Sequence, residues 1–487
     1  MEMNMDAVKG KGMEGKQFRT LPIVTSFLIA GFIGMFSETA LNMALNDLIV
    51  IFNIEPTTVQ WLTTGFLLTL GILVPISGLL LQWFETRQLF FASLSFSILG
   101  TLIAALAPTF EFLLVARIVQ AVGTALLLPL MFNTILLIFP PEKRGGAMGM
   151  IGLVIMFAPA TGPTISGLII ENLTWHWIFW ISLPFLVFAL LFGIRYMENV
   201  STVTKPKIDI ISIILSTLGF GGIVFGFSSA GEGGDHSGGW ENPVVIVSLV
   251  VGVLSLLLFS IRQFKMEQPM INLRTFKYPM FVLGLILVFM SMMLILSTML
   301  LLPMYMQAGL GLTSFTAGLL LLPGGLINGF LSPVMGRLFD KYGPKWLVIP
   351  GLALCTAVLW FFTGITTTST VTLIIVLHSC LMIGVSMIMM PAQTNGLNQL
   401  PPQLYPDGTA IMNTLQQVAG AIGTAIAVSI LASGQKDFLA GVSNPLDPAN
   451  IPAALTSGVQ NAFTFALIVA ALGFICSFFI KRVKPKH

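Results

Sequence analysis

Charged residues are scarce in this chain. Only 9% of its 487 residues are Asp, Glu, Lys or Arg, whereas a soluble domain carries about 25%. Hydrophobic residues make up 55% of the chain, and the mean hydropathy is +0.93. This composition excludes a string of ordinary soluble domains and predicts an all-α integral membrane protein that crosses the bilayer many times.

Several patterns that would indicate other functions are also missing. The three cysteines lie in apolar stretches and match neither a disulfide framework nor a metal-ligand pattern, so we expect no metal site. No P-loop of the form G-x-x-x-x-G-K-S/T occurs, which excludes ATP as an energy source bound by this chain. No paired nucleophile and base stands out, so we do not expect an enzyme. The net charge of +3 gives no reason to expect nucleic acid.

The apolar residues form fourteen segments that could each cross a bilayer, which takes about 20 helical residues. We place them at 21–46, 57–82, 87–107, 110–138, 144–171, 176–198, 208–229, 241–263, 278–308, 313–339, 344–363, 370–398, 407–434 and 457–482. Lys and Arg gather before the first segment, after the even-numbered segments up to the tenth, and at the end of the chain. By the positive-inside rule, both termini are then cytoplasmic. The first twenty residues lack a short apolar core, so no cleaved signal peptide is predicted.

One acidic residue lies inside the first segment. Glu38 shares a helical face with Gly31, Gly34 and Asn42, which suits a cavity or a packed interior better than lipid. An ionisable group in mid-membrane costs at least about 2.5 kcal/mol, and such groups usually carry protons, ions or substrate. Because loss of hydration disfavours a charged carboxylate, Glu38 is our candidate proton carrier. The alternative is a structural acid that is permanently paired across the helix interface.

The fourth segment contains a basic residue, Arg117, which shares a face with Gln120 and Thr124. Its guanidinium group cannot lose its proton, so it is a fixed positive charge that must be paired or hydrated. It could act on the acid differently in different conformations or hold water for a proton relay. The alternative is a structural staple to carbonyl groups and glutamine side chains, and the two roles are compatible.

A short pattern occurs twice. The stretches from Gly78 to Arg87 and from Gly336 to Lys345 each contain a glycine, an apolar stretch and a polar turn that ends in a basic residue. They follow spans 2 and 10, so spans 7 and 8 would be an insert between two six-helix bundles related by an axis along the membrane normal. The predicted division is a tail (1–20), an amino-terminal bundle (21–198), a two-helix insert with linkers (199–265), a carboxy-terminal bundle (266–482) and a second tail (483–487).

These stretches carry a family resemblance. The second copy is similar to the loop motif G-x-x-x-D-R/K-x-G-R/K of the major facilitator superfamily. Arg117-Ile-Val-Gln120-Ala-Val-Gly123 resembles the R-x-x-Q-G-x-G motif of its drug:proton antiporter branch, and the stretch from Ala158 to Gly167 resembles the antiporter motif of span 5. The stretch that begins at Glu38 is similar to the D/E-x-x-x-x-N-x-A-L element of span 1. Nearly the whole chain resembles the fourteen-span exporters of the lincomycin-resistance type.

The resemblance implies a major facilitator fold with six, two and six helices, pseudo-twofold halves, and a proton gradient in place of any cofactor. It implies proton coupling at Glu38 and Arg117. For a substrate cavity we expect polar groups from several helices, namely Asn42, Thr64, Gln120, Tyr305, Gln307, Asn413 and Gln416. For conformational gating we expect Pro159, Gly162, Pro163, Gly167, Gly336, Asp340, Lys341 and Gly343.

The first copy departs from the family pattern. Gln82 and Trp83 stand where the family has an acidic and a basic residue. The charge network that latches the amino-terminal half is therefore in doubt. We expect the latch at the second copy, which keeps Asp340 and Lys341, or in neutral hydrogen bonds.

The predicted function is proton-coupled export of amphipathic drugs across the bacterial cytoplasmic membrane by alternating access. The expected partners are small amphipathic substrates, protons and the lipid bilayer, and the chain is expected to act as a monomer. An alternative is an exporter of an endogenous metabolite, lipid or signalling nucleotide, although a nucleotide would need more cavity cations than Arg117. A non-transporting sensor or scaffold would usually carry a sizeable soluble domain, and none is present.

Overall fold

The computed structural model describes residues 9–11, 17–54, 56–59, 61–201, 203–205, 208–231, 239–442, 447 and 450–483. Two short strands, β1 (Lys9–Lys11) and β2 (Gln17–Arg19), pair antiparallel with Lys9 opposite Arg19. The other described elements are helices, as expected for a chain that must satisfy its backbone hydrogen bonds inside a bilayer.

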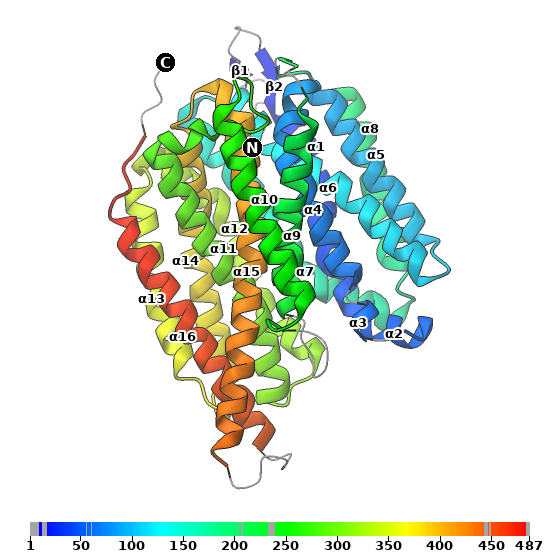
Figure 1. Cartoon of the computed structure of the whole chain (residues 1–487), viewed down its shortest axis with the longest axis vertical. Coiled ribbons are helices and arrows are strands. Elements are labelled where there is room, and N and C mark those ends of the chain that lie inside the picture. The colour runs from blue at the N-terminus through cyan, green and yellow to red at the C-terminus, as the bar shows by residue number, and fades with distance from the viewer. Residues whose placement is uncertain are drawn as a thin grey trace, which may run out of the picture.

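Fourteen helices in the described part of the chain are long and apolar enough to cross a membrane, which confirms the predicted number. They are α1 (Thr20–Ala40), α4 (Trp61–Trp83), α5 (Thr86–Ala105), α6 (Phe110–Ile138), α7 (Arg144–Asn172), α8 (Trp177–Tyr196), α9 (Ile210–Gly231), α10 (Pro243–Lys265), α11 (Pro279–Met304), α12 (Ser314–Tyr342), α13 (Lys345–Thr363), α14 (Val371–Leu397), α15 (Tyr405–Ala440) and α16 (Ile451–Ser477). Helix α1 begins and α16 ends at the same end of the bundle, which we call the N/C end (Figure 1).

Short elements extend or interrupt several of these helices. They are η1 (Leu41–Ala44), α2 (Leu45–Phe52), α3 (Pro56–Val59), η2 (Pro141–Lys143), η3 (Leu273–Lys277), η4 (Tyr305–Gly309) and η5 (Pro402–Leu404). The expected first span, 21–46, is therefore interrupted: α1 stops at Ala40 and a 3₁₀ turn follows. Helix α11 likewise passes into one turn of π-helix, η4, just after Pro303, whose ring cannot donate a backbone hydrogen bond.

Helices α7 and α12 pack closely along much of their lengths. At the N/C end the backbones of Gly145 and Gly336 touch, and a Cβ atom on Gly145 would lie 2.6 Å from Phe339 Cδ1. One turn further along, Gly149 faces Ser332. Small residues allow this approach, so one of the amino-terminal helices (α1–α8) and one of the carboxy-terminal helices (α11–α16) are in direct backbone contact at the N/C end.

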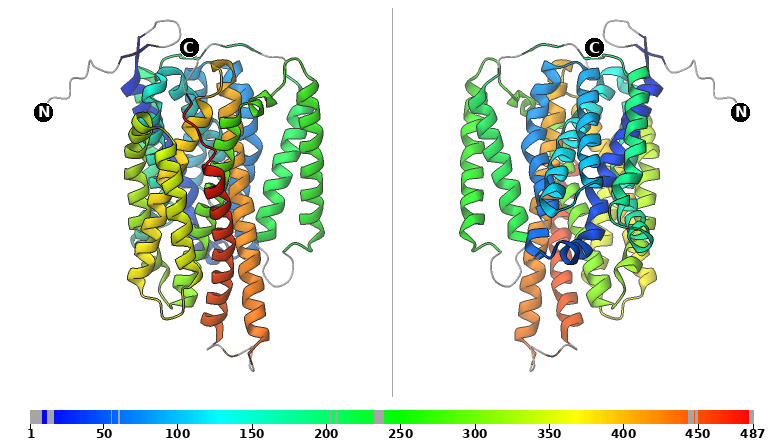
Figure 2. Two further views of the ribbon diagram at one scale, coloured as in Figure 1. Left: turned by 90° about the vertical axis from the view of Figure 1, so that its left-hand side faces the viewer. Right: turned by 90° about the vertical axis from the view of Figure 1, so that its right-hand side faces the viewer.

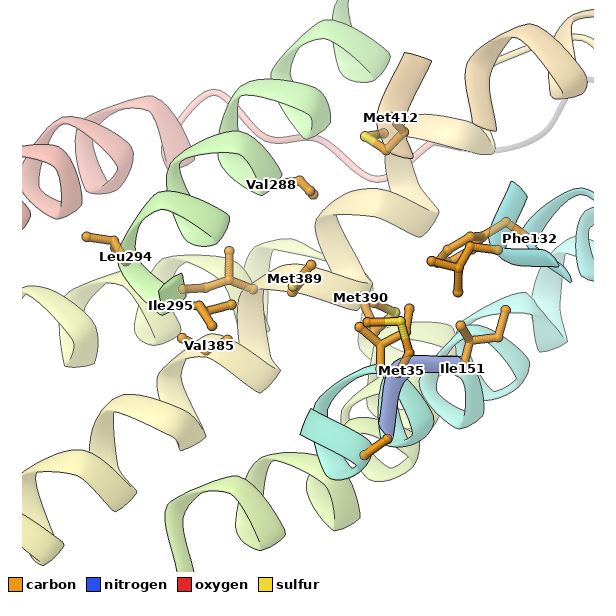
Figure 3. Packing of buried hydrophobic residues seen from close by; sticks show 14 of the residues in the cluster. Met35, Phe132, Ile151, Val288, Leu294, Ile295, Val385, Met389, Met390 and Met412 are labelled. Atoms are coloured by element: carbon orange, nitrogen blue, oxygen red, sulfur yellow. The ribbon is translucent and has the colours of Figure 1, made fainter. Parts of the chain in front are cut away.

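Apolar side chains from both sets form the interior. Figure 3 shows the residues of this buried cluster, with Met35, Phe132 and Ile151 on the amino-terminal helices and Val288, Leu294, Ile295, Val385, Met389, Met390 and Met412 on the carboxy-terminal helices. The cluster is continuous between the two sets. The apolar core therefore extends across the predicted boundary between the two bundles.

Helices α9 and α10 form a hairpin beside the other helices (Figure 2). Helix α9 contacts α4 on one side and α15 on the other, whereas α10 packs mainly on α9 and exposes apolar side chains such as Leu254 and Leu258. The predicted boundary at residue 265 coincides with the end of α10, and residue 198 lies between α8 and α9. The division into two bundles and an insert stays a prediction.

Candidate functional site

Arg117 lies in α6 and is almost completely buried, with 1% of its surface exposed. Its Nη1 donates to the carbonyl oxygen of Ser37 (2.8 Å) and to Oε1 of Gln120 (3.2 Å). Its Nη2 donates to the carbonyl oxygen of Glu38 (3.4 Å), and its Nε donates to the carbonyl oxygen of Leu62 in α4 (3.3 Å). The guanidinium group therefore connects α1, α4 and α6, which is the geometry of the staple alternative.

Two further side chains complete the surroundings of this charge. The guanidinium carbon of Arg117 lies 4.3 Å from the centroid of the Phe66 ring, a cation–π contact that is worth about 2 kcal/mol in a desolvated site. Gln120 donates from Nε2 to Oγ1 of Thr101 in α5 (2.9 Å), which fixes the direction of its amide. Carbonyl dipoles and an aromatic face thus stabilise the positive charge of Arg117.

Glu38 lies two residues before the end of α1. Its Oε2 atom is buried and has no hydrogen-bond partner among the described residues. Arg117 bonds to its carbonyl oxygen, and no ion pair of the Glu38 carboxyl group occurs in the described part of the chain. A buried carboxyl group with an unbonded oxygen is suited to binding and releasing a proton. The role of Glu38 in proton coupling stays a prediction.

One predicted gating residue of α7, Gly162, lies against the segment that carries Glu38. Gly162 faces Thr39 so closely that a Cβ atom would collide with the Thr39 hydroxyl group and lie 3.5 Å from the amide nitrogen of Ala40. Gly167 and Pro159 belong to the same helix. The Pro163 side chain lies outside the described residues. The 3₁₀ turn η1 starts directly after Ala40, so α7 packs where α1 changes its helical geometry.

The predicted cavity residues occupy five elements. Thr64 lies in α4, Gln120 in α6, Tyr305 and Gln307 in η4, and Asn413 and Gln416 in α15. Five of them are buried, and Gln307 is half-buried. Asn42 belongs to η1, but its side chain lies outside the described residues.

Several of these groups bond to the protein itself. Tyr305 donates to the carbonyl oxygen of Thr366 (2.5 Å), and Asn413 donates to that of Thr409 (2.8 Å) in its own helix. Gln416 differs, because its Nε2 atom is buried and has no partner among the described residues. Within the described residues, Gln416 thus keeps an unbonded amide donor in the interior. A shared cavity for the set stays a prediction.

Asp340, at the end of α12, bonds across the interface between the two sets of helices. Its Oδ1 accepts from the amide of Gly145 and its Oδ2 accepts from the amide of Gly146, each at 2.8 Å. These amides open α7, where unpaired N–H groups and the helix dipole favour a negative charge. The contact of Gly336 with Gly145 brings the carboxyl group into position.

The other two predicted gating residues flank this contact. Lys341 is exposed, and its Nζ lies 5.1 Å from the centroid of the Tyr342 ring. Gly343 follows α12 with φ of 83°, a backbone conformation that glycine adopts readily and that stops the helix. Both residues therefore shape the end of α12, and neither forms the bond to α7 that Asp340 forms.

Arg144 is a second connection between the two sets, and we did not select it from the sequence. Its Nη1 donates to Oδ1 of Asn398 (3.0 Å) and to the hydroxyl oxygen of Tyr405 (2.9 Å). Its Nη2 and Nε donate to the carbonyl oxygens of Leu136 (2.6 Å) and Phe139 (3.1 Å). A signal was present: two consecutive prolines precede Arg144 and Tyr405 by the same number of residues. Equivalent positions of the repeat therefore touch one another at the N/C end.

Comparison with known proteins fits this architecture. The family model described as Major Facilitator Superfamily matches residues 27–424. The chain belongs to the Major Facilitator Superfamily. It is 74% identical to the lincomycin resistance protein LmrB of Bacillus subtilis (strain 168), over 97% of this chain and 98% of that protein. It is 67% identical to a protein of the same name from Listeria monocytogenes, over 96% of this chain and 98% of that protein.

The fold is also that of a solved transporter. The crystal structure of the human organic anion transporter MFSD10 (TETRAN) aligns with a TM-score of 0.66 and 14% sequence identity, and it covers 94% of this chain and 99% of that chain. At this identity the likeness concerns the fold alone. Together with the family match, it makes this chain a multi-pass membrane protein of a transporter family, and the all-α fold with fourteen spans is confirmed.

Proposed function

We propose that this protein exports amphipathic drugs across the bacterial cell membrane in exchange for protons. The two relatives from Bacillus subtilis and Listeria monocytogenes are named for lincomycin resistance, which supports drug export as the direction and lincomycin as a first substrate to test. The observation that carries the proton part is the Glu38 carboxyl group, which has a buried oxygen without a hydrogen-bond partner among the described residues, while Arg117 donates to the backbone carbonyl oxygen of the same residue.

The contacts at the N/C end suggest the conformation. Asp340 and Arg144 join the two sets of helices there, and Lys and Arg are concentrated at that end, which the positive-inside rule makes cytoplasmic. The protein would then be closed to the cytoplasm. In this state Glu38 would accept a proton from outside. The change to the inward-open state would release that proton to the cytoplasm, and the return to the outward-open state would carry the substrate out.

The test uses purified protein in liposomes with an imposed pH gradient. Wild type should accumulate lincomycin or the fluorescent cation ethidium against its concentration gradient. We expect Glu38→Gln to lose this uphill transport and to retain downhill exchange, because the amide keeps the shape of the side chain and cannot carry the proton. Glu241→Gln, the same change at an exposed position, is the matched control.

Two results would contradict the proposal. Uphill transport by Glu38→Gln at the wild-type rate would place proton coupling elsewhere. If wild type moves neither compound, an endogenous metabolite or lipid becomes the better substrate class. The second result leaves the family and the fold untouched, because they rest on sequence and architecture alone.

A further inference from the structure

The two copies of the repeated pattern end differently at the N/C end. In the second copy, Asp340 crosses to the amino terminus of α7. In the first copy, Gln82 occupies the equivalent position in α4, and its Nε2 donates to the carbonyl oxygen of Gly78 in its own helix (3.3 Å). Helix α15 packs against this end of α4, so an acid at position 82 would bond to the start of α15. An acid is present in the first turn of α15 itself, Asp407.

Asp407 binds a linker of the insert. It is buried, with 4% of its surface exposed, and its Oδ1 accepts from the amide of Asn272 (2.9 Å). The same linker is fixed to the end of α10, because Oε1 of Gln263 accepts from the amides of Met270 (2.7 Å) and Ile271 (3.3 Å). The α9–α10 hairpin is thereby attached to the start of α15.

The linker on the other side of the hairpin is attached to α4. The amides of Thr204 (3.0 Å) and Lys205 (3.2 Å) both donate to the carbonyl oxygen of Gln82. Lys205 has φ of 46°, a left-handed conformation that is strained for a lysine and occurs in the turn where both amides bond to this carbonyl. The residue that replaces the family's acid thus carries the other attachment.

The base of the hairpin is closed by charged and polar groups. Arg262 of α10 donates to both carboxyl oxygens of Asp209, which precedes α9 (2.6 and 3.0 Å). Gln263 donates to Oγ of Ser212 (2.6 Å), and Ser212 donates to Asp209 (2.5 Å). These bonds hold the ends of α9 and α10 together, so a pull on one linker is transmitted to the other.

We infer that the α9–α10 hairpin is a strap that ties the N/C end of α4 to that of α15 and replaces the acid missing from the first copy. The ends of α4 and α15 touch in this structure, where Gly78 packs on Ala410. When they separate, the attachment at Gln82 or the attachment at Asp407 must break. The strap therefore favours the closed state at the interface that lacks the family's charge latch.

The attachments act in series, which gives a sharp test. A cysteine at Ala410 reports separation of α4 from α15, because Ala410 is fully buried and lies against Gly78 of α4. The three native cysteines are first replaced by serine or alanine, namely Cys355, Cys380 and Cys476. The labelling rate of Ala410→Cys by a maleimide is then measured on the full chain in lipid nanodiscs, without any transport.

Two single variants remove one attachment each. Asp407→Ala removes the acceptor for Asn272. Lys205→Pro removes an amide donor and cannot adopt a positive φ. Lys205→Gly is the matched control, because glycine keeps the amide donor and readily adopts a positive φ. Each of the first two should raise the labelling rate roughly tenfold, the effect of losing one hydrogen bond of about 1.4 kcal/mol. The double variant should label no faster than either single variant, because losing one of two attachments in series already frees α4 from α15.

Restoring the family's acid provides the rescue. Gln82→Asp in the Asp407→Ala background places a carboxylate opposite the start of α15 and should return the labelling rate toward that of wild type. Two results would overturn this inference. One is a labelling rate in the double variant that equals the product of the two single effects, and the other is an unchanged labelling rate in Lys205→Pro. Because Lys205 lies in an exposed linker, its variants keep the inference testable if Asp407→Ala does not fold. The readout is independent of substrate and of proton coupling.

Discussion

The contact between Asp340 and α7 allows a quantitative prediction about the closed state. Asp340→Asn preserves the shape of the side chain and keeps one oxygen acceptor, but it turns an NH₂ group toward an amide that now lacks an acceptor. A hydrogen bond to a charged group contributes about 1.5–3 kcal/mol. Losing one bond and weakening the other should cost about 2 kcal/mol, which is roughly a 30-fold shift of the equilibrium toward opening at the N/C end.

Distances between spin labels measure this shift. Labels attached through Glu142→Cys and Lys345→Cys occupy exposed positions on the two sets of helices near the contact. Asp340→Asn should populate a longer distance in the absence of substrate. Asp437→Asn, the same change at an exposed residue near the opposite end, should leave the distribution unchanged. An unaltered distribution in Asp340→Asn would refute the reasoning that this carboxylate holds the closed state.

Two further predictions rest on single contacts. Gly145→Ala should favour the same longer distance by about 1–3 kcal/mol, because its Cβ would collide with the backbone of α12. Gly146→Ala is the control and should resemble wild type, because the nearest new contact of its Cβ is the flexible Arg337 side chain at 3.4 Å. The hydrogen bonds from Arg262 hold the pKa of Asp209 at about 2, below the ordinary value of about 3.9. This pair therefore stabilises the fold above pH of about 4, and the stabilisation is lost as the pH falls toward 2. Thermal unfolding of wild type and Asp209→Asn should differ at pH 7 and converge in acid, and an equal difference at both pH values would contradict this assignment.

Much of the fold follows from the sequence because bilayer crossing imposes a simple rule. Apolar segments of sufficient length predicted the number of membrane helices. The positions of Lys and Arg agree with an even number of spans. Boundaries were less accurate where helices continue outside the apolar layer. Helix α15 was expected over 407–434 and extends to Ala440, because a polar sequence can continue a helix once water is available to its side chains.

The candidate site was predictable in its ionisable residues and not in their partners. Glu38 and Arg117 are conspicuous because charge is costly in an apolar segment. The partners of Arg117 are mostly backbone carbonyl groups, for example that of Ser37, and every residue type carries one. From the sequence, Arg144 served only as one of the basic residues that orient the chain in the membrane, because a basic residue at a helix end is usually solvated. Its burial depends on α14 and α15, which are distant in sequence.

The projecting end of α15 and α16 has a practical consequence for imaging. Helix α15 has 36 residues, or about 54 Å at 1.5 Å per residue, and with α16 it extends beyond the other helices at the opposite end (Figure 1). Gly434 and Gly458 hold the pair close, since a Cβ on Gly434 would lie 2.8 Å from Gly458 Cα. A bundle of membrane helices offers few landmarks for electron cryo-microscopy. This helical pair would emerge from the detergent belt, where a rigid antibody fragment could bind it and guide particle alignment.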